Sequence, residues 1–70
     1  MQITMVSASV YRTDANQVAR DGKRAFGEMR FNANNVSEAQ ARCYCRALAE
    51  RDGIINPRIE VRTFDMEVTA

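Results

Sequence analysis

A helix with a defined start and a defined stop lies in the second half of the chain, and it limits how the flanking segments can fold. Residues 37–40 read Ser-Glu-Ala-Gln, which matches the capping box: Ser37 is the N-cap and Gln40 reaches back from the third helical position. Gly53 is suited to a left-handed C-terminal cap, and the following Asn-Pro pair prevents continuation. We therefore predict one helix over residues 37–52.

This helix is amphipathic. At about 100° per residue, four side chains fall in one apolar stripe and four charged side chains lie opposite. The apolar stripe is Ala41, Tyr44, Cys45 and Leu48, and the charged stripe is Glu38, Arg42, Arg46 and Glu50. We expect the apolar stripe to pack and the charged stripe to face solvent, where Arg42 and Arg46 are candidate interaction residues.

Residues 2–12 have the composition of a central strand, because they are rich in β-branched and small residues and place apolar side chains on both faces. Ile3 and Met5 share one face, whereas Val6, Ala8 and Val10 share the other. This change of face predicts a bulge near Met5.

Two further segments are predicted to be edge strands. Residues 24–33 alternate between one apolar set and one largely charged set that includes Glu28 and Arg30. Residues 58–68 place Ile59 and Val61 inward, and a phase slip at residues 62–63 would then keep the next apolar set inward as well. That set is Phe64, Met66 and Val68. Residues 13–22, which are polar and end in Asp-Gly, are predicted to be a long loop or a hairpin tip.

The predicted fold class is α+β, a ββαβ chain in which residues 1–70 form a single small domain. A right-handed crossover gives a three-stranded antiparallel sheet of order 2-1-3, with one helix packed on one face. A domain of this size buries only about 60% of the surface that its unfolded chain exposes, so the core is thin.

The residue types present argue against an enzyme. The chain has no histidine, the commonest general base and metal ligand, so no catalytic residue, cofactor or metal is predicted. Cys43 and Cys45 point about 200° apart on a helix and cannot share a metal or form a disulfide. Cys45 is predicted to be a core residue and Cys43 an exposed one. Glu28 and Glu60 are predicted to form cross-strand salt bridges with neighbouring arginines rather than an acid pair.

Composition limits the partners. The net charge is only +1, there is no apolar run long enough for a membrane span, and we expect a cytoplasmic protein. The one concentration of positive charge is a basic loop at residues 20–24, near Arg12 and Arg30. Its side chains Arg20, Lys23 and Arg24 give the alternative function, a small nucleic-acid-binding module.

One helix covers only one face of a three-stranded sheet, so apolar side chains of the central strand must remain on the other face. Either Val6, Ala8 and Val10 or Ile3 and Met5, with Phe26 beside them, are predicted to be uncovered, and we take the first set as candidate interaction residues. Uncovered apolar surface on a small domain marks an interface. The occupant is predicted to be a second copy in a homodimer or a different protein.

In element order and size the chain resembles small phage-encoded inhibitors, such as inhibitors of bacterial RNA polymerase and anti-CRISPR proteins. The resemblance carries no sequence motif and transfers no functional residue. It implies a protein that occludes a surface on a larger machine. The leading prediction is therefore a small non-enzymatic protein-interaction module.

Overall fold

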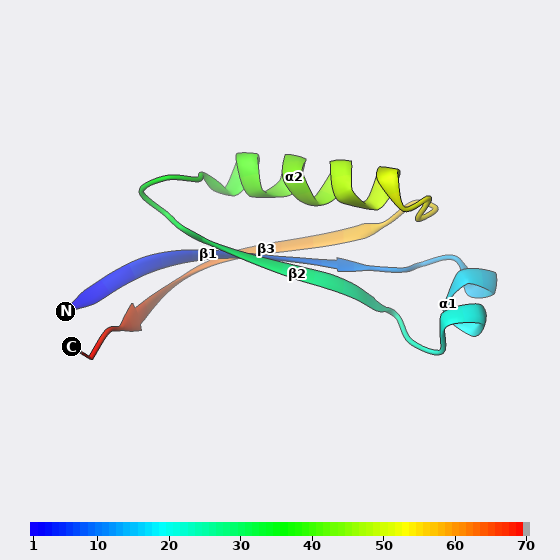
Figure 1. Cartoon of the computed structure of the whole chain (residues 1–70), viewed down its shortest axis with the longest axis horizontal. Helices are drawn as coiled ribbons and strands as arrows, with labels where there is room; N and C mark the ends of the chain where they lie inside the picture. Colours follow the sequence, from blue (N-terminus) through cyan, green and yellow to red (C-terminus); the bar gives the residue numbers. More distant parts are fainter. Residues whose placement is uncertain (70) are drawn as a thin grey trace.

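A computed structural model describes residues 1–69 and shows a three-stranded antiparallel sheet with two helices (Figure 1). The elements in chain order are β1 (Gln2–Tyr11), α1 (Ala15–Asp21), β2 (Ala25–Asn32), α2 (Glu38–Arg51) and β3 (Arg58–Glu67). The strand order is β2-β1-β3, so the α+β class and the predicted order are confirmed. The description with a single helix is wrong, because α1 was predicted to be a loop.

The helix α2 follows its local signals. Ser37 is the N-cap, its hydroxyl accepts a hydrogen bond from the Gln40 backbone N–H at 3.1 Å, and the Gln40 side chain accepts from the Ser37 N–H at 2.9 Å. The helix ends at Asp52, followed by Gly53 at φ 71°. Ile54 folds back and is buried, and its N–H donates to the Ala49 carbonyl at 2.9 Å. Both predicted ends of the helix are confirmed.

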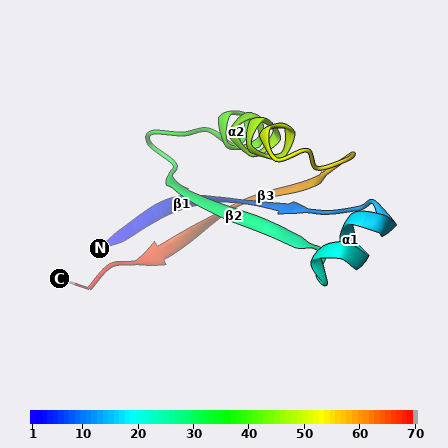
Figure 2. The same cartoon turned by 45° about the vertical axis from the view of Figure 1, so that its right-hand side comes forward.

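The core lies between α2 and one face of the sheet (Figure 2). Val6, Ala8 and Val10 of β1 are buried there against a helix stripe of small residues. This stripe is Ala41, Cys45 and Ala49, each fully buried. The predicted stripe was wrong in part, because Ala49 is buried whereas Tyr44 is half exposed and contacts Phe31 at 5.7 Å between ring centroids. A helix spacing of four keeps the three small residues in one line, which lets α2 approach the sheet closely.

The cysteines lie as predicted. Cys45 is buried in the core and Cys43 is exposed, and both are free thiols. Burial raises the pKa of the Cys45 thiol, because the thiolate would lose its hydration in the core.

The segment predicted as a loop contains α1. Asp14 is its N-cap and accepts a hydrogen bond from the Gln17 N–H at 3.1 Å, and Gly22 ends it at φ 76°. An Asp followed three residues later by Gln, with Gly beyond the last turn, is a helix signal of the same kind as in α2. The prediction gave greater weight to the Asp-Gly pair as a turn and missed the cap before it.

Contacts between distant segments hold α1 in place. The Gln17 side chain is buried, donates to the Gly53 carbonyl at 2.8 Å and accepts from the Ile55 N–H at 3.0 Å. The Thr13 hydroxyl donates to the Asn56 carbonyl at 2.6 Å. The short helix is thus fastened to the loop that follows α2, at the far end of the sheet from the two termini (Figure 1).

Two expectations about strand register are wrong. β3 pairs with β1 without interruption, from Gln2 opposite Glu67 to Tyr11 opposite Arg58, so the predicted phase slip at residues 62–63 is absent. The irregularity in the sheet lies between Val10 and Tyr11 rather than near Met5. An unbroken ladder keeps every backbone hydrogen bond between the two strands, whereas a bulge would leave one residue unpaired. The change of face within β1 therefore needs no bulge, because the two apolar sets lie on opposite faces of a regular strand.

Within residues 1–69, no helix has the length and apolar content that crossing a membrane requires.

Candidate interaction surface on the open face of the sheet

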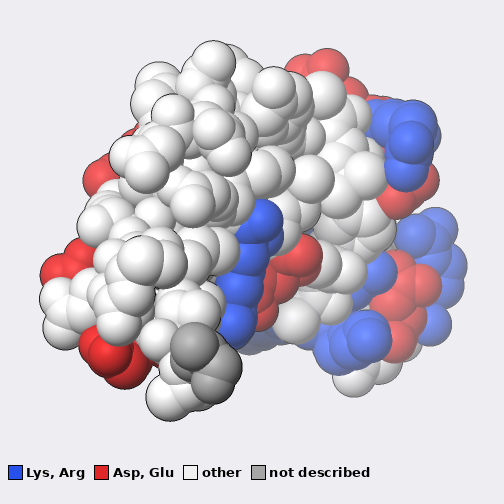
Figure 3. Space-filling model, turned by 60° about the vertical axis from the view of Figure 1, so that its left-hand side comes forward, with Lys and Arg blue, Asp and Glu red and all other residues white. Residues whose placement is uncertain are grey.

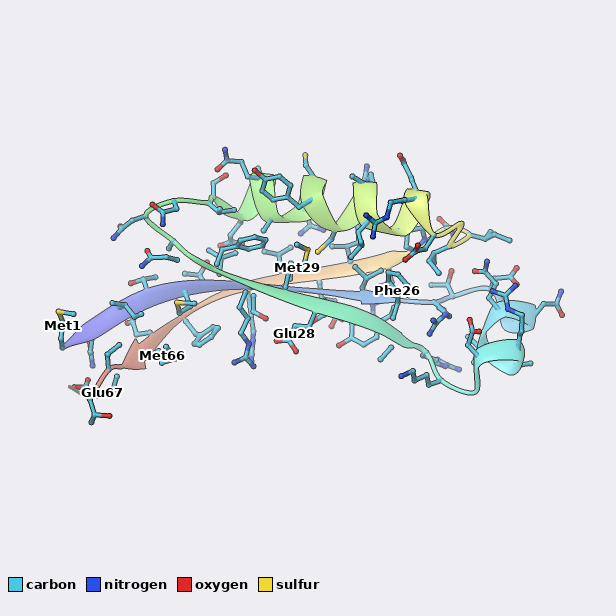
Figure 4. All side chains as sticks on the ribbon, in the orientation of Figure 1. Met1, Phe26, Glu28, Met29, Met66 and Glu67 are labelled. Carbon is cyan, nitrogen blue, oxygen red and sulfur yellow. The ribbon has the colours of Figure 1, made fainter. Side chains whose placement is uncertain are left out.

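The face of the sheet that points away from α2 is covered by neither helix (Figures 1 and 2). Alternation along the strands and the pairing register assign its residues. We call this surface the open face, and it consists of Ile3, Met5, Ser7, Ser9 and Tyr11 from β1, Glu28, Arg30 and Asn32 from β2, and Arg58, Glu60, Arg62, Phe64 and Met66 from β3. Figure 4 shows the division on β2, where Met29 points toward α2 and Glu28 away from it.

One end of the open face is apolar. Met5 pairs with Phe64 and Ile3 with Met66 in the register of β1 and β3, which places the four side chains together. On the other side of the sheet at this end, the Thr4 hydroxyl donates a hydrogen bond to Asp65 at 2.9 Å in an exposed position. The helix-side surface here is polar, so the apolar side chains point away from the protein's own core.

This end of the sheet is not covered by α2 because the helix is shorter than the strands. A 14-residue helix spans about 21 Å and a ten-residue strand about 33 Å, so α2 cannot cover β1 and β3 along their whole length. At the start of α2, the Thr63 hydroxyl donates a hydrogen bond of 2.7 Å to Glu38. Beyond Thr63 the sheet extends past the helix.

The middle of the open face is a polar hollow. Ser7 and Ser9 form its floor, and charged side chains of the two edge strands form its walls: Glu28 and Arg30 on β2, Glu60 and Arg62 on β3. On β2, Arg30 Nε lies 2.9 Å from Glu28 Oε1; on β3, Arg58 lies 2.6 Å from Glu60. The prediction of cross-strand salt bridges was wrong: Glu28 and Glu60 each pair with an arginine two residues away on the same strand. The hollow has a volume of about 470 Å³.

These ion pairs add little to the stability of the fold. Their side chains are 45–67% exposed, and exposed ion pairs contribute about 0–1 kcal/mol each. Arg62 has no carboxylate within ion-pair distance among residues 1–69, and its guanidinium carbon lies 5.3 Å from the centre of the Phe64 ring. The charges are therefore available to a binding partner at small cost to folding.

Glu28 is held in its ionised form. The Arg30 guanidinium donates a hydrogen bond to it at 2.9 Å, the Ser7 hydroxyl donates another at 3.0 Å, and the charges of Arg30 and Arg62 act in the same direction. These interactions place the pKa of Glu28 below its ordinary value of 4.5. Because the pKa is lowered in the folded state, the associated stabilisation is present above the ordinary pKa and is lost as pH falls through the lowered one.

A carbon-detected NMR titration of the Glu28 carboxyl is expected to give a midpoint below 4.5. Arg30→Gln is expected to raise this midpoint more than Ser7→Ala does, because the Arg30 hydrogen bond is the largest cause and its charge adds to it. Arg46→Gln, a change on exposed α2 surface, is the matched control and should leave the midpoint unchanged. A wild-type midpoint at 4.5 or above would contradict the hydrogen-bonded arrangement.

The apolar residues predicted to be uncovered on β1 were assigned to the wrong face. Val6, Ala8 and Val10 are at most 2% exposed and lie under α2. The alternative pair, Ile3 and Met5, lies on the open face. Phe26 is not beside them: the irregularity near Val10 turns it toward the core, against which it packs (Figure 4). Phe64 and Met66 were predicted to point inward after a phase slip, and this was wrong: the unbroken alternation of residues 58–67 places them on the open face.

The predicted basic residues are dispersed. Asp21 Oδ2 lies 2.9 Å from Arg12 and 3.5 Å from Arg20, which neutralises part of the basic loop. Arg12 also stacks on Phe26 at 5.3 Å and donates to the Lys23 and Ala25 carbonyls, so its role is structural. In Figure 3, positive and negative groups are intermixed over the visible surface rather than separated into one basic region.

Lys23 and Arg24 lie in the basic loop, as predicted, whereas Arg30 lies away from it. Lys23 and Arg24 are exposed, and Arg24 lines a hollow of about 500 Å³ between α1 and the end of the sheet. Arg30 lies on the open face, paired with Glu28. The structure therefore does not gather the predicted set into one phosphate-binding surface.

The charged stripe of α2 is exposed, as predicted, and part of it is engaged with the sheet. The Arg42 guanidinium donates to the Ile59 carbonyl at 3.2 Å and Glu38 accepts from Thr63, so both contact the edge strand β3. Arg46 is exposed and forms no recorded ion pair within residues 1–69. In the same part of the chain, no three His, Cys, Asp or Glu side chains gather where they could hold a metal ion.

Comparisons with protein-family models, with curated proteins and with solved structures found no match to this chain, so the open face itself is the basis for inferring function.

Proposed function

We propose that this protein is a small, non-enzymatic interaction module that binds another protein chain through the open face of its sheet. The observation that carries this proposal is the position of Ile3, Met5, Phe64 and Met66 on the side of the sheet away from α2. No core of this domain requires them there, since the helix-side surface at the same end is polar. Apolar surface that a fold leaves uncovered beside ordered charges is typical of an interface.

The charges beside the apolar end suit a protein surface. Interfaces combine an apolar centre with polar and arginine-containing surroundings, and arginine is among the residues that contribute most to binding. Arg62 lies over Phe64 at the boundary between the two parts of the open face. Binding that occludes a surface on host machinery, as in phage-type inhibitors, is one form of this function.

The experiment compares binding by variants of two aromatic residues, the partly buried Phe64 and the half-exposed Tyr44. Phe64→Lys changes the open face, and Tyr44→Lys makes the same kind of change on α2, which leaves the open face intact. Each immobilised protein is exposed to bacterial lysate, untreated or nuclease-digested, and retained proteins are quantified. We expect Phe64→Lys to reduce the amount of captured protein about tenfold or more and Tyr44→Lys to leave it unchanged, because an aromatic anchor in an interface is worth about 2 kcal/mol or more.

Two outcomes would contradict the proposal. Equal loss in both variants would show that the open face has no special role. Capture that disappears after nuclease digestion would instead support the nucleic-acid alternative, and Lys23→Glu with Arg24→Glu should then abolish it. Circular dichroism of each variant confirms that the fold is retained.

A further inference from the structure

The charges of the open face are arranged in two rows of opposite sign that run across the strands. Ser7 pairs with Arg30 on one side and Arg62 on the other, and Ser9 pairs with Glu28 and Glu60. We call these the arginine row, consisting of Arg30, Ser7 and Arg62, and the glutamate row, consisting of Glu28, Ser9 and Glu60. The rows are about 6.6 Å apart along the strands, and their outer members are about 9.6 Å apart across them.

We propose that the open face binds a second copy of this chain, face to face, about a two-fold axis that crosses the strands between the arginine row and the glutamate row. This inference rests on the proposed function and names the partner. Such an axis reverses position along the strands and keeps position across them. Arg30 then meets Glu28 of the second copy, and Arg62 meets Glu60 of the second copy, which gives four arginine–glutamate pairs by symmetry.

The other simple two-fold arrangement is unfavourable. An axis parallel to the strands exchanges β2 with β3 and keeps position along them, so the arginine row would meet the arginine row and the glutamate row the glutamate row. Like charges placed opposite each other disfavour an interface strongly. The charge pattern therefore selects the axis that crosses the strands.

Under the same axis, the next rows outward also place complementary side chains of the two copies opposite each other. The row of Met5 and Phe64 meets the row of Tyr11 and Arg58 of the second copy. Phe64 then faces an arginine, an arrangement that favours a cation–π contact. Met5 faces Tyr11, a sulfur–aromatic contact. Met5 and Phe64 of each chain are thus covered by the aromatic and basic end of the other, whereas the row of Ile3 and Met66 lies one step beyond the overlap.

The area of the open face that the second copy covers limits the expected affinity of the dimer. Under this axis residues 5–11 of β1 lie opposite the same stretch of the second copy, so about seven residues of each of the three strands overlap, which corresponds to about 330 Å² per chain, or about 670 Å² in total. Specific stable interfaces bury about 1,200–2,000 Å², so a weak dimer is expected, with a dissociation constant of about 100 μM or weaker. The hollows over the serines would join into a water-filled chamber, and ordered water is common in interfaces of this kind.

The experiment uses two charge-reversal variants, each of which is expected to form a weaker homodimer by itself but a heterodimer of near wild-type affinity when the two are mixed. Arg62→Glu places two glutamates opposite each other twice in its own dimer, and Glu60→Arg does the same with arginines. Each is expected to weaken the dimer at least about tenfold by analytical ultracentrifugation. Mixed together, they restore opposite charges at both positions, so native mass spectrometry should detect a heterodimer with a dissociation constant within about threefold of the wild-type value.

The same pair of changes on β2, Arg30→Glu and Glu28→Arg, is expected to behave in the same way. This second pair excludes a dimer formed by edge pairing through β3, which would not respond to charges on β2. Arg46→Glu on α2 is the matched control and should leave the dissociation constant unchanged. Circular dichroism and thermal unfolding of each monomer check that every variant folds.

Three outcomes would overturn the inference: a wild-type chain that stays monomeric at millimolar concentration, a mixture that does not form heterodimers, or an effect of one strand's pair only. These outcomes are distinguishable from failure of the proposed function. A monomeric protein whose capture of another protein is still lost on Phe64→Lys would keep the proposed function and reject the second copy as the partner.

Discussion

Replacing Ala8 by leucine is expected to lower the free energy of unfolding by about 3 kcal/mol or more, because the side chain has no space to occupy. Ala8 is fully buried in the middle of β1 and lies among the core residues that α2 covers. The helix contributes Ala41, Cys45 and Ala49 to that contact, and all three are fully buried. Three added carbon atoms would push α2 away from the sheet.

The loss expected for Ala8→Leu is large relative to the total free energy of unfolding of the domain. A domain of 70 residues has a total stability of about 4–10 kcal/mol, so this change would leave a substantial unfolded fraction. Ser9→Leu is the matched control, because Ser9 is the next residue on the same strand and lies at the floor of the open hollow. It should change stability by less than about 1 kcal/mol.

Urea unfolding followed by circular dichroism measures both variants. If Ser9→Leu were the more destabilising change, the assignment of faces on β1 would be wrong. If neither had an effect, α2 would not be packed closely against the sheet. The comparison therefore tests the correction that moved Val6, Ala8 and Val10 from the open face into the core.

Gln17→Ala is expected to lower the free energy of unfolding by about 2–4 kcal/mol. The variant loses two hydrogen bonds of the buried side chain, one to the Gly53 carbonyl and one from the Ile55 N–H. Each backbone group left without a partner in a buried place costs about 1–3 kcal/mol. The loss should be seen first as faster amide hydrogen exchange in α1 and at Ile55.

A second substitution separates the two bonds. Gln17→Glu keeps an acceptor for the Ile55 N–H but cannot donate to the Gly53 carbonyl while ionised, so about half or more of the loss should remain at neutral pH. Asn16→Ala is the control, because it lies beside Gln17 in α1 and is exposed; its effect should be within about 0.5 kcal/mol. Equal effects of Asn16→Ala and Gln17→Ala would mean that the anchor between α1 and the loop after α2 is unimportant.

These two positions show how the fold supports its binding surface. Close packing at Ala8 holds α2 against one face of the sheet, and the anchor at Gln17 holds the loop from which β3 begins. β3 then carries three of the five charged side chains of the open face, together with Phe64 and Met66. Damage at either position should therefore weaken binding indirectly, through loss of folded protein, whereas Phe64→Lys should weaken it directly.

Local signals in the sequence determined the parts of the fold that need only a few neighbouring residues. The capping box at Ser37 and the glycine at position 53 define both ends of α2, because hydrogen bonds of the caps form within the segment itself. The burial of Cys45 and the exposure of Cys43 follow from helical spacing in the same way. The strand order followed from connection rules and from the two apolar faces of β1.

Only the tertiary structure decided which face of β1 the helix covers and how the open face is composed. Both faces of this strand carry apolar residues, so alternation alone could not choose between them. The choice follows from the position of α2, which is shorter than the strands and packs its small residues over Ala8. The register of β3 depended on an unbroken ladder with a strand far away in sequence, and that ladder placed Phe64 and Met66 opposite Met5 and Ile3. Contacts of this range depend on the whole fold, whereas caps and periodicity can be read from a short segment.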